Sequence, residues 1–196
     1  MALRTASAVL EGISPYSQSR YHDTPRLNDK ETPEAFDRRT WREHAHYDPQ
    51  TREVYIPAMS VKFAVAEAAR RLAIKKKGQQ TYTKNMLSGI LVPANIPLGV
   101  KVDDLKEERF FANLDGIRGG QKRGMRGYPI VPAGWRATAE IMILDEAIPE
   151  EIVERCLAEA GNLIGIGRFR PEKGGFLGRF VVKSIKWRNA ETLKAA

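Results

Sequence analysis

Alternating apolar and polar positions predict strands at both ends of the chain and in its second half. The clearest alternation runs through 135–144, where one face carries Trp135, Ala137, Ala139, Ile141 and Ile143, as expected of a strand with one buried face. The short, β-compatible segment 5–13 ends at the turn signal Ser14-Pro15 and is interpreted as a first strand. Residues 179–187 are interpreted as the last strand.

Two segments instead repeat their apolar residues with the helical period of about 3.6. The first places Val61, Val65, Ala68 and Leu72 on one face, and we expect Ser60 to be its N-cap. The second is expected to open at Pro149, which suits a first helical turn, and to close at Gly161. Its predicted buried stripe is Val153, Cys156, Leu157 and Ala160, which makes Cys156 a core residue.

The remaining regions follow neither period. Residues 16–52 are polar and hold three prolines, which predicts a long excursion for binding or assembly with one helical turn around 33–44. Residues 79–102 resemble short strands joined by turns. The run 116–134 holds six glycines and two prolines, which predicts a mobile loop or an extended ribbon and no regular structure. A second glycine-rich stretch, 165–178, precedes the last strand.

Strand, helix, strands, then strand, helix, strand is close to βαββαβ, the order of ferredoxin-like and RRM-like α+β domains. We therefore expect a single domain over 1–196, with a polar excursion at 14–53 and a basic glycine-rich insertion at 116–134. Such a two-layer domain leaves one sheet face free to bind an extended strand.

Composition narrows the class of protein. The chain has 196 residues, 42% hydrophobic and 29% charged, which is typical of a globular domain and not of a disordered chain. No apolar run reaches the roughly 18 residues of a membrane helix, and the first ten residues do not resemble a signal peptide, so a cytoplasmic protein without membrane contact is expected. The single cysteine allows no internal disulfide and no cysteine zinc cluster.

The net charge of +8 favours a polyanionic partner, and its distribution is more informative than its size. Residues 1–52 are neutral, 53–102 carry +6, 103–163 carry −4, and 164–196 carry +6. Within the first positive segment Arg70, Arg71 and Lys75 to Lys77 cluster near the predicted helix end, where basic residues suit the helix dipole as well as they suit nucleic acid.

Two glycine-rich stretches combine backbone freedom with positive charge. The stretch 116–128 carries Arg118, Lys122, Arg123 and Arg126, suited to phosphate contact, although a solvated loop with incidental charge is the alternative. In 165–180 the basic residues Arg168, Arg170, Lys173 and Arg179 interleave with Phe169, Phe176 and Phe180, which offers phosphate contacts beside stacking platforms. The phenylalanines are alternatively core anchors, and Phe180 is expected to be one. Neither a P-loop nor a dinucleotide fingerprint fits this stretch.

These residues together resemble a known family. The segment Ile56-Pro57-Ala58-Met59-Ser60-Val61-Lys62 is similar to the Ile-Pro-Gly-Ser-Ser-Leu-Lys element of the repeat-associated mysterious proteins, the RAMP superfamily of CRISPR systems, and 165–180 is similar to their C-terminal glycine-rich loop. The combination is most similar to the backbone subunits that polymerise along guide RNA in multisubunit CRISPR effectors of antiviral defence. Ala58 stands where the family has glycine, and the length is short for such a subunit, which leaves a standalone or phage-borne relative open.

The resemblance implies a set of contacts. Ser60, Lys62 and the glycine-rich loop with Gly167 would grip a single-stranded backbone. The segment 116–128 would be a thumb-like projection contacting the strand, and 16–52 a projection between subunits. The implied partners are guide RNA, further copies of the chain along the strand, and other CRISPR effector subunits; no cofactor or metal is implied.

Catalysis is the alternative expectation. Some RAMP relatives cleave RNA with His, Tyr or Lys, and some backbone subunits use an Asp on a loop. All three histidines, His22, His44 and His46, lie in the polar excursion, and His44 and His46 would share one side of a strand. The loop candidates are Asp23, Asp29, Asp37 and Asp115.

The leading interpretation is thus a noncatalytic, sequence-independent single-stranded nucleic-acid-binding subunit. The alternatives are a guide-processing endoribonuclease of the same superfamily that uses a histidine, a single-stranded DNA-binding protein on the same fold, and a purely structural assembly subunit.

Overall fold

The structure, a computed structural model, describes residues 3–113 and 123–189. Its strands are β1 (Arg4–Gly12), β2 (Tyr16–Ser17), β3 (Glu53–Ile56), β4 (Lys75–Lys77), β5 (Gln80–Thr81), β6 (Ile90–Leu91), β7 (Ile96–Lys101), β8 (Lys106–Asn113), β9 (Arg123–Val131), β10 (Arg136–Ile143) and β11 (Phe180–Asn189). Its α-helices are α1 (Pro33–Thr40), α2 (Ala58–Leu72), α3 (Thr83–Ser88) and α4 (Glu150–Glu159). No helix within these two ranges is long and apolar enough to cross a bilayer.

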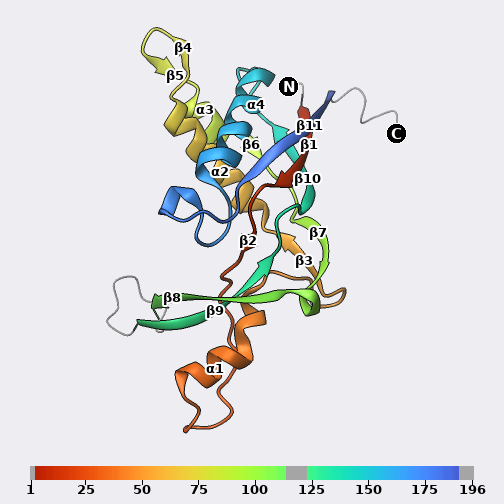
Figure 1. The fold of residues 1–196 in the computed structure, drawn as a ribbon. Coiled ribbons are helices and arrows are strands. Elements are labelled where there is room, and N and C mark those ends of the chain that lie inside the picture. The colour runs from red at the N-terminus through yellow and green to blue at the C-terminus, as the bar shows by residue number, and fades with distance from the viewer. Residues whose placement is uncertain (1–2, 114–122, 190–196) are drawn as a thin grey trace.

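A four-stranded antiparallel sheet with the order β11-β1-β10-β6 forms the centre of the molecule. Helices α2 and α4 pack against each other beside this sheet (Figure 1). This frame is βαββαβ, formed in chain order by β1, α2, β6, β10, α4 and β11. If its strands β1, β6, β10 and β11 are numbered one to four, they lie side by side in the sheet in the order 4-1-3-2. The predicted α+β, ferredoxin-like fold class is confirmed.

The core lies between the sheet and these helices. In β10 the residues Ala137, Ala139, Ile141 and Ile143 are buried, and in β1 they face Ala6, Ala8 and Leu10. Small residues on both strands let the helices approach closely. Cys156 and Phe180 are each only 1% exposed, so both are core residues as predicted. Burial raises the pKa of the Cys156 thiol to about 11.

The long insertions build a second sheet with the order β2-β9-β8 below the first (Figure 1). Here the expectation that 116–134 forms no regular structure is wrong, because Arg123–Val131 is one nine-residue strand, β9, paired along its length with β8. Its glycines fit the hairpin: a Cβ on Gly127 would lie 2.4 Å from Glu107 Oε1. Residues 114–122, including most of the predicted thumb, lie outside the described residues.

Three predicted element ends are corrected by the structure. Helix α2 begins at Ala58, so Ser60 lies inside its first turn, and the Asn95 side chain accepts a hydrogen bond from the Ala58 amide instead. Gly161 does not close α4, because the chain continues as a π-helical turn over Ala160–Ile164. Glycine is needed there since a Cβ would lie 2.1 Å from the Phe180 carbonyl oxygen. Finally, α2 ends at Leu72, before the three lysines.

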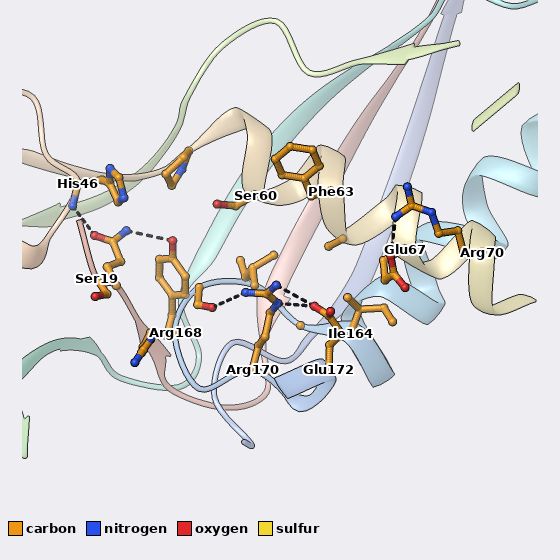
Figure 2. Close-up of a pocket in the computed structure, with 17 residues that line it drawn as sticks. Ser19, His46, Ser60, Phe63, Glu67, Arg70, Ile164, Arg168, Arg170 and Glu172 are labelled. Carbon is orange, nitrogen blue, oxygen red and sulfur yellow. Dashed lines mark hydrogen bonds and ion pairs between the residues drawn. The ribbon is translucent and has the colours of Figure 1, made fainter. Parts of the chain in front are cut away.

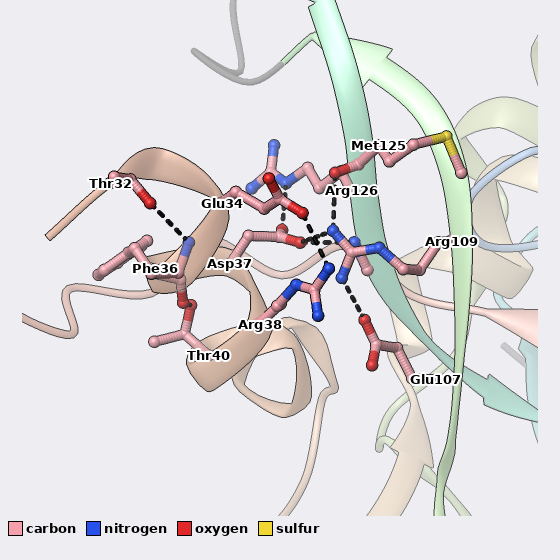
Figure 3. Close-up of polar contacts among 12 residues, drawn as sticks. Thr32, Glu34, Phe36, Asp37, Arg38, Thr40, Glu107, Arg109, Met125 and Arg126 are labelled. Atoms are coloured by element: carbon pink, nitrogen blue, oxygen red, sulfur yellow. Dashed lines mark hydrogen bonds and ion pairs between the residues drawn. The ribbon is translucent and has the colours of Figure 1, made fainter.

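The polar excursion 16–52 is anchored by a buried carboxylate (Figure 3). Asp37, on α1, is only 5% exposed. Its Oδ2 accepts hydrogen bonds from the Gly127 amide at 2.8 Å and from Arg109 at 3.1 Å, and its Oδ1 lies 3.6 Å from Arg126 Nε. Both arginines belong to the β8–β9 hairpin. A buried carboxylate needs such partners, so this cluster fixes α1 onto the hairpin.

The glycine-rich loop 165–178 is closely packed. Gly165, Gly167, Gly174 and Gly178 have positive φ angles, which favour glycine. A Cβ on Gly178 would lie 1.8 Å from the Ile166 carbonyl oxygen, and a Cβ on Gly167 would lie 2.2 Å from the Ser17 carbonyl oxygen. The Arg168 amide donates to that Ser17 oxygen at 2.8 Å. The loop is therefore docked on β2, and its glycines serve close backbone packing.

We predict that Gly178→Ala destabilises the domain by about 2 kcal/mol or more, because the new methyl group adds a backbone clash to the strain of a positive φ. Gly174→Ala is the matched control: its φ is +79°, and nothing lies within 4 Å of a Cβ placed there. It should cost only about 1 kcal/mol. Urea unfolding followed by circular dichroism measures both; equal losses would contradict close packing at Gly178.

Candidate nucleic-acid interface

One face of α2 and the glycine-rich loop form a cavity of about 470 Å³, here called the helix cavity (Figure 2). Ser60, Phe63, Glu67 and Arg70 line it from α2. They recur every three or four residues and so share one side of the helix. Gly165 to Arg168 with Arg170 and Glu172 line the opposite wall. Phe63, one of the lining residues, is 62% exposed.

A buried glutamine shapes the end of the helix cavity near the N-terminal excursion. Gln18 is only 3% exposed, and its Nε2 donates to the Tyr16 hydroxyl at 3.1 Å and to the Tyr55 carbonyl at 2.8 Å. Its Oε1 accepts from the His46 amide at 2.6 Å. The glutamine thereby fixes three chain segments that meet at this cavity, and His46 lines it.

The charges in the helix cavity are largely paired. Arg170 donates to Glu172 at 2.8 Å and to the Gly167 carbonyl at 3.2 Å, while Arg70 pairs with Glu67 at 2.7 Å (Figure 2). This cavity therefore offers an aromatic ring, a hydroxyl and paired charges, a mixture suited to a nucleobase or sugar.

A second cavity of about 820 Å³, here called the histidine cavity, lies on the other side of the loop. It shares Ser19, Gly167, Arg168 and Arg170 with the helix cavity, so the two cavities adjoin, and together they are here called the groove. No acidic residue lines it among the described residues, whereas five cationic side chains do: Arg20, Arg126, Arg168, Arg170 and Lys173. Three of the five are paired with carboxylates outside the cavity, Arg126 with Asp37 and both Arg170 and Lys173 with Glu172. The positive charge that remains, on Arg20 and Arg168, attracts an anion such as phosphate.

Arg20 and Arg168 are held by aromatic rings. Neither forms an ion pair with a carboxylate in the described part of the chain. The Arg20 guanidinium lies 5.7 Å from the ring centre of Tyr47, and that of Arg168 lies 5.1 Å from the ring centre of Phe169. A stacked guanidinium keeps its edge free to bind phosphate.

Phe169 connects the loop to the hairpin. Its ring centre lies 4.5 Å from that of Phe110 and 5.1 Å from that of Tyr128, which it meets edge-on. It adopts φ +57°, an unusual value for a residue other than glycine. This aromatic cluster places the loop against β8 and β9.

The histidines do not lie as predicted. His44 ends a 3-10 turn over Trp41–His44, so it shares no strand face with His46, and the two rings line different cavities. His22 lies beside His44, with 4.7 Å between ring centres. Nδ1 of His44 lies 3.0 Å from the Arg20 carbonyl oxygen, and Nε2 lies 3.1 Å from Arg126 Nη2. Nδ1 therefore donates and Nε2 accepts, which leaves His44 no free ring nitrogen for proton transfer.

The groove collects seven of the twelve residues predicted to bind nucleic acid: Ser60, Arg126, Gly167, Arg168, Phe169, Arg170 and Lys173. Three others do not line either cavity. The Arg179 side chain donates to the Asn162 carbonyl at 3.0 Å, Arg123 stacks 4.9 Å from the centre of the exposed Phe111 ring, and Lys62 lies on α2 away from the lining face. Arg118 and Lys122 lie outside the described residues.

Sequence reasoning missed several lining residues. Phe63, Glu67 and Arg70 form the second, mostly polar stripe of α2, and their spacing from Ser60 was a signal that could have found them. Arg20 and Tyr21 in the excursion also line the groove. The only sequence feature that marked them is that a basic residue stands beside an aromatic one.

Of the aspartates considered for cleavage, Asp37 is fully engaged with Arg109 and Gly127. No group of three or more potential ligands in the described residues is placed to hold a metal ion.

Fold and groove together define the class of protein: an α+β ferredoxin-like domain with a basic groove lined by aromatic residues. No family model and no curated protein sequence matches the chain. Among solved structures, it is similar to a chain of the type III-B Cmr-beta complex bound to cognate target RNA, with a TM-score of 0.52, 12% identity and 94% of this chain covered. The chain spans 60% of that neighbour's length. It also matches Cmr6 from Pyrococcus furiosus, with a TM-score of 0.49, 10% identity, and coverage of 93% of this chain and 98% of that one. The resemblance expected from the sequence is confirmed as a likeness of fold.

Acid should destabilise this site. Burial is the main cause that lowers the pKa of His22, His44 and His46. A histidine with a lowered folded pKa contributes stability that is complete above its unfolded pKa of about 6.5 and is lost as the pH falls toward the folded value. Between about pH 7 and pH 5 the melting temperature is therefore expected to drop. His44→Gln should flatten this pH dependence more than His22→Gln, because His44 is only 3% exposed. An unchanged pH profile in both variants would contradict this role.

Proposed function

We propose that this chain is a noncatalytic RNA-binding subunit of the RAMP type, which holds a single strand, a guide RNA in the first instance, in the groove formed by the helix and histidine cavities. The observation that carries the proposal is the histidine cavity. No carboxylate lines it among the described residues, and two of its five cationic side chains, Arg20 and Arg168, lie against aromatic rings and have no carboxylate partner in the described ranges. Phosphate contact through such groups does not depend on base identity.

Three independent features support RNA as the ligand. The segments Ile56 to Lys62 and 165–180, which resemble RAMP motifs, meet across the helix cavity. The fold is similar to that of a chain in the type III-B Cmr-beta structure, which is bound to cognate target RNA. The groove offers aromatic rings beside cations, as proteins that bind single strands do.

The two cavities suit different parts of a nucleotide. Phosphates would lie in the histidine cavity over Arg20 and Arg168, with Lys173 at its edge. Bases would turn toward Phe63 in the helix cavity, where the paired carboxylates Glu67 and Glu172 disfavour phosphate. The loop between the cavities would thus be crossed by the sugar-phosphate backbone. The engaged ring nitrogens of His44 favour binding over cleavage.

Assembly along the strand is part of the same proposal. Strand β8 is an edge of the three-stranded sheet, and its Phe111 is 59% exposed opposite Met125, which is 48% exposed. An exposed apolar pair on an edge hairpin suits contact with a neighbouring copy or another effector subunit.

The double variant Arg20→Gln with Arg168→Gln is expected to weaken binding of labelled single-stranded RNA by roughly tenfold or more. Because each lost phosphate contact removes about 0.7 from the slope of log affinity against log salt, the slope should become shallower by about 1.4. Fluorescence anisotropy over a salt series measures both quantities, with DNA of the same sequence as a competitor.

The matched control is Arg179→Gln with Lys186→Gln, which removes the same charge outside the groove. It should bind nearly as the wild type does. Undetectable or salt-insensitive binding by the wild type would overturn the proposed function, as would an equal loss in both variants. Preference for DNA would favour the single-stranded DNA-binding alternative, and cleavage of the labelled RNA that His22→Ala abolishes would favour the endoribonuclease.

If the chain polymerises on its ligand, the mass of the complex should rise in steps with RNA length, and Phe111→Ser with Met125→Ser should reduce the number of copies per strand without abolishing binding of the first. Multi-angle light scattering after size exclusion measures this. A single copy on every length of RNA would contradict assembly along the strand.

A further inference from the structure

The β4–β5 hairpin carries three consecutive exposed lysines, Lys75, Lys76 and Lys77, just beyond the C-terminal end of α2 (Figure 1). They are the whole of strand β4. Lysine and other charged residues are common on edge strands because they prevent aggregation. Protection against aggregation does not explain why three lysines stand side by side on so short a strand. Adjacent like charges repel one another, so the cluster has an electrostatic cost.

The helix dipole does not account for these lysines. Helix α2 ends at Leu72, and Ala73 adopts a left-handed conformation with φ 44° that turns the chain away from the helix axis. The hairpin is then held in place at its base. The Tyr82 amide donates to the Ile74 carbonyl at 3.0 Å, and Thr83 Oγ1 donates to the Ala69 carbonyl at 3.2 Å. The lysines therefore sit at a defined position relative to α2.

Their charge is largely unpaired within the described part of the chain. None of the three forms an ion pair with a carboxylate in the described ranges. Lys75 Nζ donates to the Gln79 side-chain oxygen at 3.0 Å, and Lys76 Nζ lies 5.8 Å from the ring centre of Tyr82. Lys76 is also one of the causes that lower the pKa of Asp145, after the hydrogen bonds from Asn85 and the Ala147 amide.

The groove runs toward this hairpin. The residues of α2 that line the helix cavity extend from Ser60 in the first turn to Arg70 in the last. With 15 residues, α2 is about 22 Å long. A strand that follows this face from Ser60 leaves the cavity at Arg70, five residues before Lys75 in the chain. Figure 2 shows Phe63 and Arg70 along the same side of the helix.

We propose that the β4–β5 hairpin is a second phosphate-binding site, which holds the part of the single strand that leaves the groove beyond Arg70. The inference rests on the proposed function. Lysine suits this role because its ammonium is a flexible point charge that binds phosphate without a fixed geometry. The hairpin adds affinity and length to the binding site, while the groove orients the strand.

The test is the triple variant Lys75→Gln, Lys76→Gln and Lys77→Gln, assayed on two RNAs. One is short enough to fill only the two cavities, and the other is several times longer. We expect the variant to bind the short RNA as the wild type does. It should bind the long RNA several-fold more weakly, with a salt slope shallower by about 2, because three contacts at about 0.7 each are lost.

The matched control is Lys30→Gln, Lys183→Gln and Lys186→Gln, three exposed lysines that line neither cavity and lie outside the β8–β9 hairpin. It has the same net charge and should keep both affinities. Equal losses in the two triple variants, or an equal loss on short and long RNA, would overturn the hairpin site while leaving the groove intact. Absence of any RNA binding by the wild type would overturn the proposed function itself. Unchanged circular dichroism and melting temperature verify that both variants fold.

Discussion

The groove depends on the close approach of the glycine-rich loop to the backbone of β2. Gly167 lies against the Ser17 carbonyl and Gly178 against that of Ile166, at distances that no Cβ would allow. The Arg168 amide completes this contact by donating to Ser17. Since the loop lies between the two cavities, its position sets the shape of both. It also sends Phe169 toward the hairpin and the Arg168 guanidinium outward.

The arginines around the groove fall into two groups, according to whether a carboxylate or an aromatic ring holds them. Arg109 and Arg126 are engaged by the buried carboxylate of Asp37 and hold α1 on the β8–β9 hairpin. Arg20 and Arg168 rest on aromatic rings and keep hydrogen-bonding capacity for a ligand. Because the excursion 16–52 supplies both Asp37 and Arg20, it is at once a structural brace and a wall of the groove. Composition alone does not separate these tasks, since all four are arginines.

The segment Ile56 to Lys62 resembles a RAMP motif, and its one glycine-to-alanine difference from that motif has a simple structural account. Ala58 stands where RAMP proteins have glycine, and here it is the first residue of α2, in a conformation that alanine adopts without strain. Its amide is bound by Asn95, from the segment before β7. The helix start is therefore complete without glycine, and the hydroxyl of Ser60, which does not cap the helix, is left to line the cavity.

The sequence alone determined the elements whose signals are local. The alternation in 135–144, the helical stripe from Val61, and the order of these elements were sufficient for the βαββαβ frame, because periodicity reports which face is buried. Local sequence patterns failed to predict elements that depend on partners distant in the chain. The strand β9 exists because β8 pairs with it in spite of its glycines, and the end of α4 is extended because Gly161 meets Phe180. Likewise, only the tertiary structure decided that Arg168 and Arg20 share a cavity while Arg179 turns to Asn162. Residues so far apart in the chain are brought together by backbone packing and buried ion pairs, which leave no periodic trace in the sequence.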